Sequence, residues 1–383
     1  MTATAARSQG IDLLRGLSIV LVILNHIGLR IPLKHTALGV LLPGWVSSAL
    51  NFNGYEAVCV FFVISGFLIT GNSLRRWGSL PRIDLKGFYA RRFARIVPCL
   101  LLLVAVLSLF HLMDIPDYRI HRPDQSLGRA VASALGFYLN WYEGHTGYLP
   151  GNWDVLWSLS IEEVFYIGFP LVCLLTRRTA VLAPCLVVLA LSLPYTHAAL
   201  EGNDIWQEKA YLPGMSAIAA GVLAALIAMH CRPPRRWLNL ALGCTGIAGM
   251  AMVFTQGWVL WATLKDGYIL LLTFSVACLV VSLHWSEAGG MQRFLPGTGW
   301  LQALGRLSYE VYLTHMFVAF GAVQLYKASG SHIALGWLWY PPIVALCWML
   351  GALVARFISE PADRTLRRKL LAPESVRTAE TAA

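Results

Sequence analysis

Apolar residues are gathered in long runs along the whole chain, separated by shorter polar segments. Each run has about the length that a helix needs to cross a bilayer, which is roughly 20 residues for a hydrocarbon core of about 30 Å. The pattern therefore predicts an all-α, polytopic membrane protein, a bundle of about ten transmembrane helices. The expected spans are residues 13–31, 53–71, 96–113, 157–175, 179–196, 212–230, 238–256, 268–285, 307–326 and 337–358.

One further segment, residues 127–142, is apolar enough to be read as an eleventh span. The positions of lysine and arginine argue against this interpretation, because basic residues concentrate in the cytoplasmic loops of membrane proteins. Ten spans with a cytoplasmic N-terminus place most of the 30 lysines and arginines inside, and an eleventh span would move Arg177, Arg178 and the basic run at 232–236 outside. We therefore expect residues 127–142 to form a non-spanning helix on the outer side.

Composition agrees with this picture and limits the possible partners. The chain is 57% hydrophobic and 13% charged, which excludes an ordinary soluble protein and predicts contact with membrane lipid. The net charge of +10 does not indicate a nucleic-acid partner, because the basic residues follow the membrane topology. The eight cysteines are scattered singly, so we expect neither a disulfide framework nor a metal site.

No internal repeat divides the chain. We expect a single transmembrane domain over residues 1–371 and a disordered cytoplasmic tail over residues 372–383. The topology predicts a multi-pass protein of the cytoplasmic (inner) membrane with both termini in the cytoplasm. The oligomeric state is not predicted.

The first span carries two ionisable residues, Arg15 and His26, in an otherwise apolar helix. Their separation of 11 residues places them on one helix face, about 16 Å apart along the axis. Arg15 is then near the cytoplasmic boundary and His26 is in the outer half of the membrane. Such groups usually face a polar cavity or a partner. A snorkelling arginine and an interfacial histidine are the alternative.

The fourth span carries a second polar face. Its members recur every four residues and are Asp154, Ser158, Glu162 and Tyr166. Glu163 shares its face with apolar residues instead, so Glu162 is the better candidate for a carboxylate that faces a cavity. The alternative is that both glutamates are solvated at the level of the lipid headgroups.

A third polar face lies on the ninth span. Ser308, Tyr312 and His315 follow one another at intervals of four and three residues, with Tyr309 beside them. These side chains are candidates to bind or support a substrate. Hydrogen bonds that hold membrane helices together would explain the same pattern.

A basic cluster precedes the third span, in the sequence KGFYARRFARIVP. Arg91, Arg92 and Arg95 lie at a helix start beside the bilayer boundary. Guanidinium groups bind phosphates through two parallel hydrogen bonds, so the cluster is a candidate site for a phosphorylated cofactor. The preference of basic residues for the cytoplasmic side explains the cluster equally well.

Six short sequences together carry a resemblance to a known family. They are IDLLRGLSIVLVILNH, NGYEAVCVFFVISGFLIT, FYARRFARIVP, LWSLSIEEVFYIGFP, LGRLSYEVYLTH and ISEPADR. In this order and spacing the chain resembles integral membrane acyltransferase family 3 over nearly its whole length. Members transfer acetyl or other short acyl groups, usually from acyl-CoA, to hydroxyls of sugars, surface polysaccharides or macrolides.

The resemblance implies that His26 matches the essential histidine of that family, Arg15 its upstream arginine and Glu162 the first glutamate of its SxSxEE segment. We therefore expect an O-acyltransferase that acts on a carbohydrate or lipid-linked glycan. His26 would be the general base, because imidazole titrates near neutral pH. Glu162 would hydrogen-bond its second ring nitrogen.

The expected donor is acyl-CoA, most simply acetyl-CoA, without a metal. Its phosphates would be bound by Arg15, Arg91, Arg92 and Arg95. The expected supporting residues are Ser158, Tyr166, Tyr309, Tyr312 and His315.

Three points stay open on the sequence alone. Direct transfer with His26 as base and a relay through a covalent acyl-histidine are both compatible with the sequence. A proton-coupled secondary transporter would also place Arg, His and Glu inside helices, although we find no inverted repeat of the kind many transporters have. Trp141, Trp153 and Trp157 near the outer region could stack on sugar rings or belong to an interfacial aromatic belt.

Overall fold

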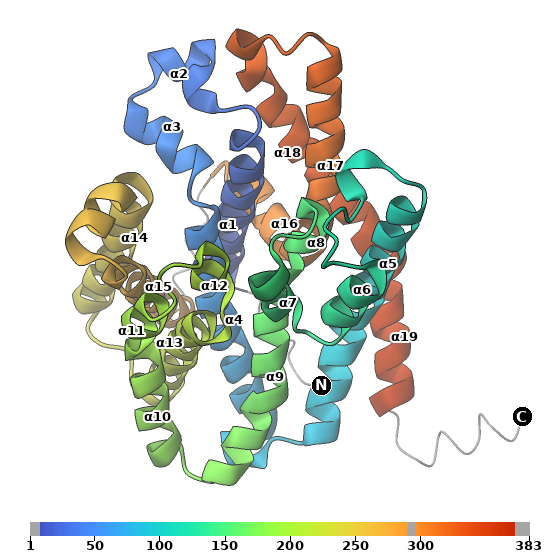
Figure 1. Ribbon diagram of the computed structural model, residues 1–383. Helices are drawn as coiled ribbons and strands as arrows, with labels where there is room; N and C mark the ends of the chain where they lie inside the picture. The colour runs from blue at the N-terminus through green and yellow to red at the C-terminus, as the bar shows by residue number, and fades with distance from the viewer. Residues whose placement is uncertain (1–7, 290–295, 372–383) are drawn as a thin grey trace, which may run out of the picture.

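The computed structural model describes residues 8–289 and 296–371, and every regular element in these ranges is a helix (Figure 1). Eight segments are long and apolar enough to cross a membrane. The prediction of an all-α, polytopic membrane protein is confirmed. The eight segments are Gln9–Gly28, Gly54–Trp77, Leu85–Leu112, Gly151–Thr176, Asp204–His230, Arg236–Leu264, Gly267–Ala288 and Ile333–Leu371.

The long helices make up most of the bundle. They are α1 (Gln9–Gly28), α4 (Gly54–Trp77), α5 (Leu85–Leu112), α9 (Leu156–Thr176), α13 (Tyr211–His230), α14 (Arg236–Leu264), α15 (Gly267–Ala288) and α17 (Ser308–Ala328). Shorter helices connect them, namely α2 (Ala37–Leu41), α3 (Gly44–Asn51), α8 (Gly151–Asp154), α12 (Asp204–Lys209) and α16 (Gly299–Arg306).

Two of the ten expected spans differ from the prediction. Residues 179–196 form α10 (Thr179–Leu191) and α11 (Leu193–Ala198), and the 13 residues of α10 cover only about 20 Å. Residues 307–326 do form a helix, α17, but its polar residues keep it outside the strongly apolar group. Length and apolarity thus support eight spans among the described residues.

The doubtful segment at 127–142 is also different in detail. It forms two short helices, α6 (Leu127–Leu135) and α7 (Leu139–Thr146), in place of the single helix expected. The break lies at Phe137, whose φ of 58° is incompatible with a continuing helix. Helices of 9 and 8 residues are too short to cross a bilayer.

Glycine allows the central helices to approach one another closely. A side chain at Gly16 of α1 would overlap the carbonyl of Leu301 in α16, and one at Gly305 would overlap the carbonyl of Asp12. The same relation joins α4 and α13, where Gly221 lies against the carbonyl of Val63. Small residues permit such backbone contact, so van der Waals packing stabilises these crossings.

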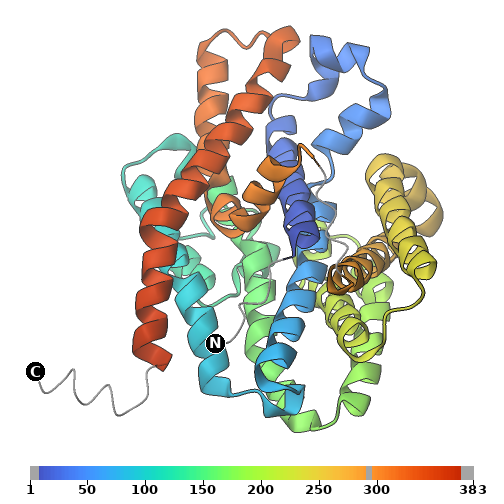
Figure 2. The same cartoon turned by 180° about the vertical axis from the view of Figure 1, so that it is seen from behind.

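The chain ends in a nearly continuous rod that starts with η4 (Ile333–Trp339) and continues through α18 (Tyr340–Val354), η5 (Ala355–Ser359) and α19 (Glu360–Leu371). Figure 2 shows α19 running alongside α5 toward the C-terminus. The expected disordered tail, 372–383, lies outside the described residues.

The last turn of α1 points to the end of the molecule that carries α2, α3 and the α17–α18 turn (Figure 1). We call this the His26 end. Helices α4 and α9 run from that side toward the opposite end, where α5 begins. The polar faces of α1, α9 and α17 therefore extend between the two ends of the bundle.

Candidate functional site

A cavity of about 770 Å³ opens between the central helices of the bundle. Its walls come from α1, α4, α5, α9, α15, α16, α17 and the last rod of the chain. Nine of the residues singled out from the sequence line it. They are Arg15, Arg92, Arg95, Ser158, Glu162, Tyr166, Ser308, Tyr309 and Tyr312.

The helical-face argument for α9 agrees with this geometry. Glu162 lines the cavity together with Ser158 and Tyr166, whereas Glu163 is 7% exposed and does not line it. Asp154, expected on the same stripe, belongs to α8 because the helix is interrupted before α9. Its carboxylate binds Lys209 instead.

The Glu162 carboxyl group interacts with positive and hydroxyl groups from three other helices. Arg92 and Arg15 act on it by charge, and Ser65 and Tyr166 act by hydrogen bonding. Ser65 on α4 and Tyr166 on α9 also share a hydrogen bond. Glu162 is thus the acidic centre of a ring of polar groups that four helices supply.

The predicted cationic residues have different surroundings. The Arg92 guanidinium lies 4.5 Å from the ring centroid of Tyr166 and lines the cavity. Arg95 also lines the cavity, but its Nη1 forms a 2.8 Å ion pair with Glu310, whose side chain is 1% exposed. The charge of Arg95 is therefore largely compensated within the protein.

Arg91 does not fit the expected role as a cavity residue. Its guanidinium donates to the carbonyl of Gly87 one turn earlier on α5, at 3.3 Å, and it is not part of the cavity wall. On a helix Arg91 lies about 100° around the axis from Arg92, with Arg95 between them, so Arg91 is on the side of α5 away from Arg92.

Several polar lining residues were not predicted from the sequence, among them Ser65, Arg75, Arg306 and Glu310. Arg75 and Arg306 both bring positive charge to the cavity wall. Ser65 and Glu310 lie within quoted motifs, but sequence spacing does not reveal which neighbouring helix each one faces.

Both polar residues of α1 face α17. Arg15 donates from Nε and Nη2 to the Ser308 hydroxyl, at 3.1 and 2.7 Å. The His26 ring lies 5.1 Å from the His315 ring, centroid to centroid. The shared face predicted for Arg15 and His26 is therefore the face that packs against α17.

The orientation of His315 is defined by its backbone contact. Its Nδ1 lies 2.6 Å from the carbonyl oxygen of Tyr312, which can only accept, so Nδ1 carries the proton. In the neutral ring Nε2 is then an acceptor, and it is buried without a hydrogen-bond partner in the described structure. His26, whose ring centroid lies 5.1 Å from that of His315, is an adjacent side chain that can offer an N–H.

The expected contact between Glu162 and His26 is not formed. Neither a hydrogen bond nor an ion pair joins them in the described ranges, and the polar ring beside His26 is His315. The cavity and the histidines are instead separated by Ser158 and Tyr312, whose hydroxyl oxygens are 2.8 Å apart. Glu162 is on the cavity side of that pair.

The three tryptophans named as sugar-stacking candidates differ in their exposure to solvent. Trp153 is 0% and Trp157 8% exposed, so both belong to the core. Trp141 is 49% exposed, and its ring lies 4.1 Å from that of His145, centroid to centroid, at a tilt of 37°. No group of three metal-ligating side chains occurs among residues 8–289 and 296–371.

The fold and the site define a class of protein: a polytopic, all-helical membrane protein with an internal small-molecule site. Arginines and a buried carboxylate line this site, and a histidine pair lies near it. The family model described as an acyltransferase domain matches residues 8–356, so the chain belongs to this acyltransferase family. The family expected from the six sequence motifs is confirmed.

Named relatives are O-acetyltransferases. The chain is 26% identical over 335 residues to O-acetyltransferase OatA of Staphylococcus aureus, which covers 80% of this chain and 49% of the relative. It is 30% identical over 177 residues to peptidoglycan O-acetyltransferase OatA of Listeria monocytogenes, covering 43% and 26% of the two chains. The chain thus spans about half the length of the Staphylococcus relative and about a quarter of the Listeria relative. No solved structure matches the chain.

Proposed function

We propose that this protein transfers an acetyl or other short acyl group from acyl-CoA to a hydroxyl of a carbohydrate acceptor. The observation that carries the proposal is the arginine-lined cavity, whose wall includes Tyr312, and the ring of Tyr312 lies 5.8 Å from that of His315 in the His26–His315 pair. Its volume is within the range of about 300 to 1,000 Å³ typical of small-molecule sites.

The donor phosphates would be bound by arginines of the cavity. Arg15 and Arg92 are the main candidates, and Arg75 and Arg306 can add charge from the same wall. Arg95 contributes less, because Glu310 already neutralises it. Guanidinium groups suit phosphates because their donors form a planar fork. In this arrangement Glu162 holds Arg15 and Arg92 in place.

His26 would act as the general base. It takes the proton of the acceptor hydroxyl while that oxygen attacks the thioester carbonyl, so that the C–O ester bond forms and the C–S bond breaks. The proton then passes from His26 to the departing thiolate. A hydrogen bond from a His26 N–H to Nε2 of His315 would leave the other His26 nitrogen free to accept the proton.

We further propose that the His26 end faces outward and that the opposite end, with both termini, is cytoplasmic. The donor would then enter from the cytoplasm and the acceptor from the other side. Because the Listeria relative is a peptidoglycan O-acetyltransferase, a peptidoglycan-like glycan is the first acceptor to test. Multi-pass insertion in the cytoplasmic membrane accords with this topology.

The test uses purified full-length protein with radiolabelled acetyl-CoA and an N-acetylglucosamine tetramer. Transfer of label to the sugar, with release of one CoA per ester formed, supports the proposal. Acetyl-CoA consumption without sugar labelling would mean another acceptor. Proton flux across vesicles that contain the protein, without consumption of acyl-CoA, would instead support the proton-coupled transporter considered above.

A further inference from the structure

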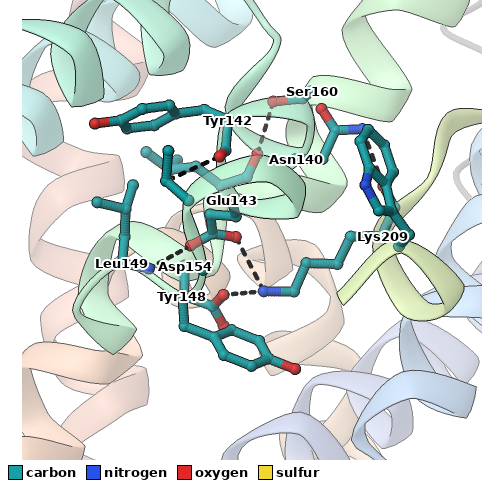
Figure 3. A network of polar contacts seen from close by, with 12 residues as sticks. Asn140, Tyr142, Glu143, Tyr148, Leu149, Asp154, Ser160 and Lys209 are labelled. Atoms are coloured by element: carbon teal, nitrogen blue, oxygen red, sulfur yellow. Dashed lines mark hydrogen bonds and ion pairs between the residues drawn. The ribbon is translucent and has the colours of Figure 1, made fainter. Parts of the chain in front are cut away.

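A buried lysine lies where several short segments meet beside the start of α9. Lys209 ends α12, and its side chain is 2% exposed. Its Nζ donates to Oε2 of Glu143 at 3.0 Å and to the carboxylate of Asp154, and it lies 4.3 Å from the centroid of the Tyr148 ring (Figure 3). Two carboxylates and one aromatic face therefore surround the ammonium group.

Each partner of Lys209 comes from a different part of the 139–154 segment. Glu143 belongs to α7, and its second oxygen accepts the backbone N–H of Leu149 at 3.0 Å. Asn140 of α7 donates to the Lys209 carbonyl at 2.9 Å. Asp154 closes α8. One side chain thus connects α7, the loop at 147–150 and α8 to α12 (Figure 3).

The same segment packs against α17, the helix that carries His315. Gly151 of α8 lies so close to α17 that an added Cβ would be 3.1 Å from Met316 and 3.2 Å from Phe320. Met316 directly follows His315 in the chain. Lys209 is also near enough to act electrostatically on His26. A shift of α8 would therefore displace α17 near His315 and change the surroundings of both histidines.

The charges of this cluster are unbalanced. One ammonium group faces two carboxylates, and Glu143 is fully buried. A buried ion pair is costly to assemble and contributes little net stability compared with apolar residues. Neither Lys209 nor its two acidic partners line the cavity, so binding of the donor does not explain the cluster.

We propose that Lys209 is a positioning residue, which holds residues 139–154 against α17 so that they form the acceptor-side wall of the site around His26. The role in acyl transfer rests on the proposed function. The expected acceptor is a hydroxylated carbohydrate, because this wall carries the exposed aromatic rings of Trp141 and Tyr148.

The test compares three full-length proteins. Lys209→Met removes the ammonium. A triple variant, Lys209→Met with Glu143→Gln and Asp154→Asn, also removes the two carboxylates and so avoids uncompensated buried charge. His197→Leu is the control, because it removes a 2.7 Å hydrogen bond between His197 Nδ1 and Asp266 that lies outside the segment.

The first readout is hydrogen exchange, which does not depend on activity. Both Lys209 variants should exchange the amides of residues 139–154 at least about tenfold faster, since charge-assisted bonds that close the segment are lost. Exchange in α4 and α5 should not change. Unaltered exchange at 139–154 in both variants would overturn the anchoring role.

The second readout is acetyl transfer from acetyl-CoA to the N-acetylglucosamine tetramer. The triple variant should raise the acceptor KM about tenfold, equivalent to 1.4 kcal/mol of acceptor binding, with an unchanged donor KM. Equal changes in both KM values, or none, would reduce Lys209 to a structural role and refute the positioning role. If the unaltered protein transfers no acetyl group, the proposed function and the positioning role fail together. Hydrogen exchange then still tests whether Lys209 anchors residues 139–154.

Discussion

At the scale of single residues, two polar residues of α1 each lie against a polar residue of α17. Arg15 donates to Ser308 on the cavity side, and the ring of His26 lies beside that of His315 nearer the His26 end. A charged or polar group at membrane depth is costly unless a partner or water receives it. The two pairs explain how α1 tolerates both residues.

The histidine pair gives the first prediction. His26→Ala should lower acyl transfer about 10²- to 10⁴-fold, the usual loss when a general base is removed. His315→Asn keeps a donor for the Tyr312 carbonyl but lacks the Nε2 acceptor, so it should lower kcat by about 10- to 100-fold through misplacement of His26. Turnover is measured with labelled acetyl-CoA, and protein in the membrane is quantified in parallel. Near-normal turnover of His26→Ala would exclude it as the base.

The neighbouring glutamates provide a second, matched comparison. Glu162→Gln should reduce activity, since it removes the charge that interacts with Arg92 and Arg15. Glu163→Gln should leave activity nearly normal, because Glu163 is outside the cavity wall and its buried Oε1 has no hydrogen-bond partner in the described structure. Initial rates at saturating donor distinguish the two. Equal losses would mean that the face assigned to Glu162 has no functional meaning.

The arginines of α5 give a third prediction. Arg92→Ala should raise the donor KM by about tenfold or more, because a charge-assisted phosphate contact contributes roughly 1.5 to 3 kcal/mol. Arg91→Ala is the control and should keep the normal donor KM, since Arg91 bonds its own helix.

Arg95→Ala should act differently, by destabilising the protein. It leaves the buried Glu310 carboxylate uncompensated, which typically costs about 3 to 5 kcal/mol. Glu310→Gln in the same chain should restore much of the melting temperature in detergent. A double variant as unstable as Arg95→Ala would contradict this account of the ion pair.

At the scale of the elements, close crossings depend on glycine. Gly221→Ala should destabilise the protein by about 1 to 3 kcal/mol, because the new methyl group meets the backbone of α4 at Val63, which cannot move aside easily. Gly168→Ala is the control, because open space surrounds that position, and it should be neutral or slightly stabilising. Thermal unfolding in detergent measures both. Equal shifts would show that the α4–α13 contact tolerates a side chain.

At the scale of the whole molecule, the orientation in the membrane can be measured. Cysteines replacing His121 and Arg178 in a cysteine-free background should label from opposite faces, the first from outside and the second from the cytoplasm. Arg178 is preferable to Arg177, whose φ of 52° makes replacement strained. Labelling of both positions from the same face would mean that α6 and α7 cross the bilayer after all.

Much of this architecture could be predicted from hydrophobic pattern alone. The spans were visible because a helix in lipid must satisfy its backbone internally and expose apolar side chains over a fixed length. Two exceptions, α10 and the pair α6 and α7, are short apolar segments whose ends depend on local turns such as the one at Phe137. A third, α17, is long enough but carries too many polar residues to count among the strongly apolar helices. Helix period also separated Glu162 from Glu163, because both lie on one regular helix.

The sequence by itself thus determined the membrane class, the family, and the faces on which Arg15, His26 and Glu162 lie. Tertiary structure decided which side chains meet across helices. It paired His26 with His315, compensated Arg95 with Glu310 and buried Lys209 between Glu143 and Asp154. The physical reason is that a helical face is a local property of spacing along one segment, whereas a contact between helices depends on the crossing and depth of two segments far apart in the chain.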